Sequence, residues 1–178
     1  KVVEEILSDF DKHFNNSLDI LSSRKLGIRN NSKKTSYLYS ELLNLMEVGK
    51  ADFTHTFKSL KAVFINEDNS IFLDNFRNLN EENQHALGNW LGDWKKFLEE
   101  TNDSKTKVIE LLNVSNPEFI MRNHLVEKSI RKATKGDFSD FEILSDLLLK
   151  PFEMKEKYEA FYKAPTDREV VHQTFCGT

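Results

Sequence analysis

Apolar residues recur at steps of three and four along most of the chain, which is the spacing of helices that bury one face. The first such segment carries a stripe made of Val3, Leu7, Phe10, Phe14, Leu18 and Leu21. The stripe predicts a helix of about six turns. It should end before Gly27, where Arg24 and Lys25 lie near the negative end of the helix dipole. The polar stretch 29–36 then predicts a loop.

Further helices are marked by residues that cap their starts or stop their ends. A second helix, with leucines at helical spacing, should stop at Gly49. Side-chain oxygens that can accept hydrogen bonds from first-turn N–H groups predict three more helix starts, at Asp52, Asn80 and Ser104. The helix after Asn80 carries Trp90, Trp94 and Phe97, which we interpret as a core stripe.

Asn116 followed by Pro117 predicts another helix start, because proline is favoured at the first helical position. This helix should run to Gly136. On its predicted apolar face Asn123 lies in the gap between Phe119 and Val126, so we expect a buried amide. Such an amide needs partners. A structural network that includes Arg122 is the first interpretation, and a ligand contact is the alternative.

A capping box of Ser139 and Glu142 predicts a last long helix that ends at Pro151. No strand-like alternation longer than a few residues and no repeat accompanies these helices. The predicted fold is therefore all-α, an irregular array of about seven helices within residues 1–150. Residues 151–178 predict a short helix near Tyr158 and an irregular tail. No linker is evident, so we expect a single helical domain over 1–178.

The composition restricts the class of partner. Hydrophobic residues make up 39% and charged residues 30%, which is typical of a globular protein. The net charge of −4 argues against a nucleic-acid partner. No apolar run approaches the roughly 20 residues that span a bilayer, so we expect no membrane partner. The lack of an export signal and the lone Cys176 favour a reducing, cytoplasmic location. The absence of an initiating Met suggests that the sequence begins inside a longer protein.

The sequence contains no complete catalytic centre. It has no glycine-rich phosphate loop, no G-x-S-x-G turn and no kinase catalytic motifs, and its histidines fall at no metal-ligand spacing. We therefore predict no catalytic, cofactor-binding or metal-binding residue within it. One candidate basic patch holds five cations and no acid, which suits a phosphate or an acidic partner but also an ordinary solvated loop. Its members are Arg24, Lys25, Arg29, Lys33 and Lys34.

Six short strings in a fixed order resemble the C-terminal region of the selenoprotein O (SelO) family. They are RKLGI at 24–28, DFTHTF at 52–57, NPEFIMRN at 116–123, KGDFS at 135–139, KPFE at 150–153 and the terminal TFCGT. The resemblance covers nearly the whole chain. It implies the C-terminal helical part of a protein-kinase-like pseudokinase, packed on the larger lobe of an upstream core that this sequence lacks.

The resemblance also implies an activity for the longer protein. SelO-like proteins bind ATP with Mg²⁺ or Mn²⁺ and transfer AMP to Ser, Thr or Tyr hydroxyls of protein substrates. The residues that hold the nucleotide and the metal lie upstream in the family, so none is carried onto this sequence. The partners implied are the chain's own kinase-like core and protein substrates. The alternative is an independent helical interaction module with no catalytic role.

Cys176 occupies the position that is selenocysteine in some members of the resembling family. It lies three residues from the end of the sequence, beyond the last predicted helix. Solvent access of this kind is what thiol–disulfide exchange requires. We therefore interpret Cys176 as a redox candidate whose partner is a cysteine of the core, and an incidental thiol in a tail is the alternative.

Overall fold

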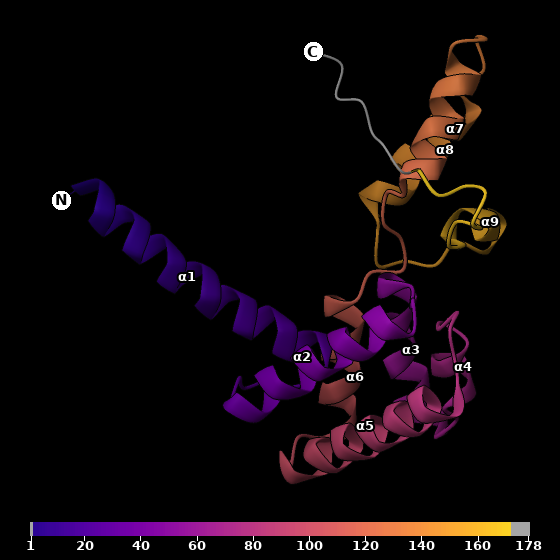
Figure 1. Ribbon diagram of the computed structural model, residues 1–178. Coiled ribbons are helices and arrows are strands. Elements are labelled where there is room, and N and C mark those ends of the chain that lie inside the picture. Colours follow the sequence, from indigo (N-terminus) through magenta and orange to yellow (C-terminus); the bar gives the residue numbers. More distant parts are fainter. Residues whose placement is uncertain (1, 172–178) are drawn as a thin grey trace. The chain divides into compact units, whose positions relative to one another are not determined.

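A computed structural model gives the structure of the chain and describes residues 2–171. Within that range the regular elements are helical, which confirms the predicted all-α class (Figure 1). Seven helices have 11 residues or more: α1 (Val2–Lys25), α2 (Lys33–Val48), α3 (Phe53–Asn66), α5 (Glu81–Glu100), α6 (Lys105–Ser115), α7 (Asn123–Ala133) and α8 (Ser139–Leu149). The shorter elements are α4 (Ser70–Leu73), η1 (Glu156–Tyr158) and α9 (Glu159–Tyr162).

The chain divides into two compact units. Unit 1 comprises residues 1–116 and unit 2 comprises residues 117–178. Each unit has its own cluster of buried apolar side chains. In unit 1, α1 packs on α2 and α6, α2 packs on α5, and α3 packs on α4 and α6. In unit 2 the main pairing is between α7 and α8.

A row of aromatic rings forms the centre of unit 1. Phe72 stacks on Trp90 at a centroid distance of 6.0 Å, and Trp90 stacks on Trp94 at 6.0 Å. The buried indoles also donate hydrogen bonds of 2.9 Å, from Trp90 to the Leu38 carbonyl and from Trp94 to the Leu26 carbonyl. The row therefore fixes α2 and the end of α1 on α5, and the predicted tryptophan core stripe is confirmed.

Only the C-terminal end of α1 joins this core. Ser22, Ser23 and Leu26 are buried, whereas the rest of the helix extends away from α2–α6 (Figure 1). Gly27 follows with φ of 74°, as the predicted helix end requires. The Lys25 ammonium turns inward and donates to the Ser115 carbonyl and the Asn116 side-chain oxygen at 3.3 Å each. Burial lowers the pKa of Lys25.

A smaller core holds unit 2 together. Phe119 meets Tyr162 edge-on at 5.9 Å, and both rings pack with Leu125, Leu144 and Leu147. The extended backbone before α7 is tied to the end of α8, because the Phe119 N–H donates to the Pro151 carbonyl at 3.0 Å. The cluster therefore joins α7, α8 and α9 within one unit.

A buried ion pair adds to the contact between α7 and α8. The Asp140 carboxylate is almost fully buried at the start of α8 and accepts a 2.6 Å bond from Lys132 of α7. Because a buried carboxylate needs a charged partner, this pair complements the apolar contact between the two helices.

The helix predicted from Pro117 to Gly136 is wrong at its start. Asn116 instead closes α6, since its N–H donates to the Leu112 carbonyl at 3.2 Å. The Asn116 side-chain amide donates a 2.9 Å hydrogen bond to the Lys25 carbonyl. Helix α7 begins only at Asn123, so the predicted helical phase fails and Asn123 is exposed rather than buried.

Two other local predictions change. The loop predicted over 29–36 is shorter, because Ser32 caps α2 in a reciprocal box with Thr35 and Lys33 is already helical. Ser139 does not cap α8 with Glu142. It is itself the first helical residue, and its N–H donates to the Asp137 carboxylate at 3.0 Å. The other predicted caps are confirmed, at Asp52, Asn80 and Ser104.

We expect Gly27→Ala to destabilise unit 1 more than Gly136→Ala destabilises unit 2. Both glycines have positive φ, of 74° and 85°, which costs an alanine about 1–2 kcal/mol. A Cβ at Gly27 would also lie 3.0 Å from side-chain carbons of Leu112 and Val108, whereas Gly136 faces open space. Crowding should add roughly 1 kcal/mol at Gly27. Urea unfolding measures both losses of stability, with tryptophan fluorescence as the signal for unit 1 and circular dichroism as the signal for unit 2. Equal losses for the two variants would contradict the crowding argument.

The corrected positions of the two asparagines make a second prediction. Asn116→Ala should cost unit 1 about 1–3 kcal/mol, because it strands the Lys25 ammonium and carbonyl that the buried amide satisfies. Asn123→Ala is the matched control. Its side chain is exposed, so the change should stay within about 0.5 kcal/mol. A larger loss of stability for Asn123→Ala than for Asn116→Ala in urea unfolding would contradict this structure and support the helix predicted from Pro117.

Candidate functional site

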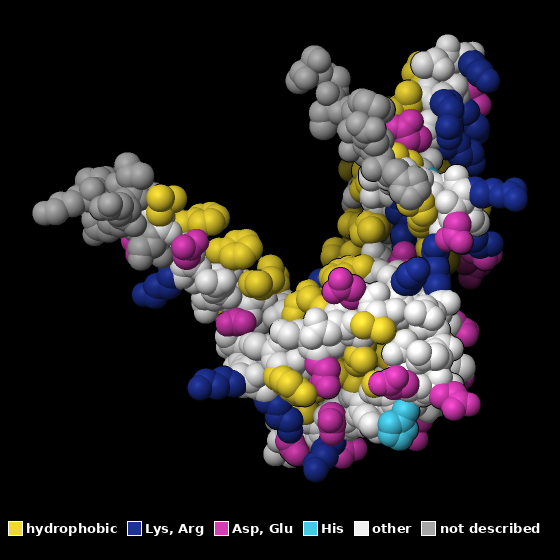
Figure 2. Space-filling view, viewed as in Figure 1, with side chains coloured by type: hydrophobic (Ala, Val, Ile, Leu, Met, Phe, Trp, Pro, Cys, Tyr) yellow, Lys and Arg dark blue, Asp and Glu magenta, His cyan; other side chains and the backbone are white. Residues whose placement is uncertain are grey.

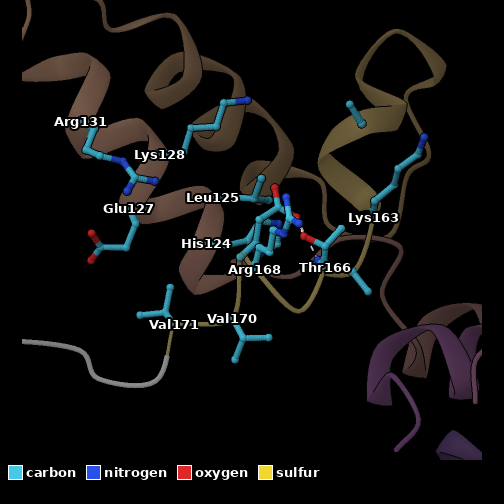
Figure 3. A pocket seen from close by; sticks show the side chains of 13 residues that line it. His124, Leu125, Glu127, Lys128, Arg131, Lys163, Thr166, Arg168, Val170 and Val171 are labelled. Carbon is cyan, nitrogen blue, oxygen red and sulfur yellow. Dashed lines mark hydrogen bonds between the residues drawn. The ribbon is translucent and has the colours of Figure 1, made fainter. Parts of the chain in front are cut away.

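A hollow in unit 2 lies between α7 and the segment that follows α9. Its cavity volume is about 640 Å³, within the range of ligand pockets. We call it the α7 cleft, and its main charged and apolar lining consists of His124, Leu125, Lys128, Arg131, Lys163 and Arg168. Figure 3 shows Lys128 and Arg131 extending from α7, with Lys163 on the wall across from them.

One face of α7 supplies the first wall of the cleft. His124, Lys128 and Arg131 are separated by four and three residues, which places them in a row along the helix. Leu125 lies beside this row and is buried in the unit 2 core, so it anchors the wall. The second wall, residues 160–171, returns along α7 after α9.

Glu169 on the second wall is held within its own loop. Its carboxylate accepts from the Thr166 N–H at 2.9 Å and from the Thr166 hydroxyl at 2.7 Å. These two hydrogen bonds lower the pKa of Glu169, and the charge of Lys128 lowers it further. Glu169 is therefore an ionised acceptor whose hydrogen bonds organise the loop.

His124 lies at the N-terminal turn of α7 and is partly buried. Desolvation lowers its pKa, and the charges of Arg122 and Lys128 act in the same direction, while Glu169 opposes them. The imidazole is consequently neutral at pH 7. It can donate or accept a hydrogen bond in the cleft without contributing charge.

The four cations of the cleft differ in their contacts with other side chains. Lys128 lies 3.7 Å from the Asp140 carboxylate and 5.9 Å from the Phe161 ring centroid. Lys163 makes an exposed pair with Glu159 at 3.8 Å. Arg131 and Arg168 are exposed, and neither guanidinium takes part in an ion pair or hydrogen bond among residues 2–171.

A second candidate surface lies on α1 in unit 1. The α1 stripe, as seen among the described side chains, consists of Leu7, Phe10, Phe14, Leu18 and Leu21. These side chains are 46–62% exposed, and Figure 2 shows apolar side chains running along the helix. The rings of Phe10 and Phe14 stack at 6.0 Å. The stripe was predicted as a buried helix face, but this structure leaves it uncovered.

The candidate basic patch does not act as one free cluster. Lys25 is directed into unit 1, as described above, and Lys34 pairs with Glu100 at 2.9 Å and lies over the Phe97 ring at 4.6 Å. Arg24, Arg29 and Lys33 are exposed. Two of the five cations are thus committed to structural contacts, which weakens the case for a phosphate site there.

The remaining candidates of the sequence have other positions. Arg122 is half-buried immediately before α7, and with Asn123 it borders a hollow of about 300 Å³ next to the α7 cleft. Cys176 lies outside the described residues. Among residues 2–171, no group of three or more His, Cys, Asp or Glu side chains could hold a metal ion. No described helix is both long and apolar enough to cross a bilayer.

The cations of the cleft were not recognised in the sequence. A row at helical spacing was present in His124, Lys128 and Arg131, but the prediction of that helix rested only on its apolar face. Lys163 and Arg168 were assigned to an irregular tail. Only the fold brings that tail back along α7.

Comparison with known proteins gives one matching family. The family described as protein adenylyltransferase SelO matches residues 1–149. The match spans unit 1 and the greater part of unit 2, and it ends before the second wall of the α7 cleft.

Curated relatives extend over the whole chain. A protein nucleotidyltransferase YdiU of Rhizobium meliloti (strain 1021) is 38% identical over 170 residues, which are 95% of this chain and 33% of the relative. Proteins of the same name from Clostridium botulinum (strain 657 / Type Ba4) and Bacillus thuringiensis subsp. konkukian (strain 97-27) are 32% and 31% identical over 100% of the chain and 34% of their own length. The chain therefore spans about a third of the length of these relatives.

Proposed function

The chain belongs to the SelO family of protein adenylyltransferases, and we propose that it is the C-terminal helical segment of a longer enzyme of that kind. The longer protein transfers AMP from ATP to Ser, Thr or Tyr hydroxyls of protein substrates. This segment is structural and regulatory within it. The names of the relatives support nucleotidyl transfer as the reaction class.

We propose that the nucleotide and metal sites of the longer protein lie outside this segment. Nucleotidyl transfer needs groups that position the phosphates and neutralise their charge. The described residues hold no acidic cluster of the size a metal needs, and the sequence has no phosphate loop. We therefore assign ATP and Mg²⁺ or Mn²⁺ to the kinase-like core in the part of the longer protein that lies outside this chain.

The observation that carries the proposed role is the α1 stripe. Five large apolar side chains, each about half exposed, lie at helical spacing along one helix. Burying one such side chain contributes about 1.5–3 kcal/mol, so an uncovered row of this length strongly favours a partner surface. The relatives are about three times as long as this chain, so two thirds of their length lies outside the matched segment. We propose that the stripe packs on the kinase-like core.

We expect the 178-residue chain alone neither to bind ATP nor to transfer AMP. The longer protein should do both, because it supplies the phosphate-binding groups. Incubation with ATP radiolabelled in the α-phosphate, with Mg²⁺ or Mn²⁺ and a protein acceptor, measures transfer by both proteins side by side. Label incorporated by the chain alone would contradict the proposed role, and so would an inactive longer protein.

Replacing Phe10 and Phe14 by serine should affect the longer protein and not the isolated chain. Both rings are exposed in this structure, so each change should alter the stability of the isolated chain by no more than about 0.5 kcal/mol. In the longer protein each should cost about 1.5–3 kcal/mol. Thermal unfolding of both proteins provides the comparison.

The matched control for the stripe variants is Ile65→Ser. Ile65 is 52% exposed on α3, away from the stripe, so its replacement should have a small effect in either protein. Equal stability losses for Phe10→Ser and Ile65→Ser in the longer protein would show that the core does not cover the stripe. The independent interaction module would then be the better description.

A further inference from the structure

The α7 cleft has a local charge opposite in sign to that of the chain. The chain carries a net charge of −4. The charged lining of the cleft consists of the cations Lys128, Arg131, Lys163 and Arg168 and the carboxylates Glu127 and Glu169. Cations therefore outnumber carboxylates there by four to two. A concave surface with an excess of one sign focuses its potential and attracts ligands of the opposite sign.

Two of the four cations already have carboxylate partners outside this lining, since Lys128 lies 3.7 Å from Asp140 and Lys163 lies 3.8 Å from Glu159. Glu169 already accepts both donors of Thr166, so part of its hydrogen-bonding capacity is used within the loop. Arg131 and Arg168, by contrast, have no ion-pair or hydrogen-bond partner for their guanidinium groups in the described part of the chain. One lies on α7 and the other on the returning segment, so each wall presents a guanidinium that can take a carboxylate.

The construction of the cleft favours a peptide over a small phosphate. Phosphate sites usually gather backbone N–H groups from a glycine-rich loop or a helix N-terminus. The lining of this cleft contains no glycine, and the Thr166 N–H is already bonded to Glu169. At the start of α7, which also borders the cleft, the Leu125 N–H donates to the Arg122 carbonyl at 3.0 Å. The cations instead stand on long side chains along two walls. Apolar side chains share the second wall with them, among them Val170 and Val171.

We propose that the α7 cleft docks an acidic, extended segment of another protein. Carboxylates of that segment pair with Arg131 and Arg168, and its intervening apolar side chains contact Val170 and Val171, which line the same cleft. This docking is a property of the present chain and does not depend on the transfer activity of the longer protein.

The test measures binding of a fluorescein-labelled peptide of alternating Glu and Leu to the 178-residue chain by fluorescence anisotropy. The same peptide with Lys in place of Glu is the charge control. We expect only the acidic peptide to bind. Arg131→Gln and Arg168→Gln should each weaken binding roughly tenfold, because each removes a charge-assisted hydrogen bond.

Two further variants separate docking from general charge and from misfolding. Arg29→Gln removes the same charge from an exposed position in unit 1 and should leave peptide binding unchanged. Glu127→Gln removes a negative charge from the cleft lining and should strengthen binding about twofold. A gain of affinity cannot result from a damaged fold. Circular dichroism checks that each variant keeps its helices.

Three results would overturn the proposal. The first is that the acidic peptide does not bind, or binds no better than its lysine counterpart. The second is that Arg29→Gln weakens binding as much as Arg131→Gln does. The third is that inorganic pyrophosphate binds the chain more tightly than the peptide and displaces it, which would make the cleft a phosphate site.

Discussion

The hydrogen bond from the Trp94 indole to the Leu26 carbonyl is the constraint on which unit 1 depends. Trp94 is fully buried in the aromatic row of α5, so the carbonyl that it fixes determines where α1 ends. Gly27 allows the chain to turn sharply at this point, and its φ is positive. The Trp94 hydrogen bond holds only the C-terminal end of α1. The rest of the helix extends beyond the core, and its described apolar side chains are exposed.

Uncovered apolar surface is a property of both units. Besides the α1 stripe, unit 2 exposes Phe138 and Phe141 around the start of α8 and Leu149 at its end. Scattered exposed apolar residues are normal on protein surfaces, but rows at helical spacing indicate interaction sites. A segment that forms about a third of its longer relatives is expected to show such rows wherever the rest of the protein covers it. Each unit therefore has its own buried apolar core, and each also exposes large apolar side chains on its surface.

The sequence predicted those features that are decided within a few residues. Asp52, Asn80 and Ser104 cap their helices because the acceptor and the first-turn N–H groups are three residues apart. Asn116 was misassigned because asparagine and proline are common both at helix starts and just beyond helix ends. Its position is settled by Lys25, 91 residues away, with which it exchanges hydrogen bonds. No local pattern contains that information.

The sequence did not predict the α7 cleft, for a related reason. Net charge is an average over the whole chain, whereas binding responds to the charge near the ligand. A chain with a charge of −4 gave no reason to look for an acidic partner outside one basic loop. The loop cations were adjacent in sequence, yet Lys25 and Lys34 turned out to be engaged in structural contacts. Arg131 and Arg168 are far apart in sequence, yet they line the same cleft. Adjacency along the chain therefore suggested a basic patch or a solvated loop at 24–34, whereas the fold places two distant arginines in one cleft.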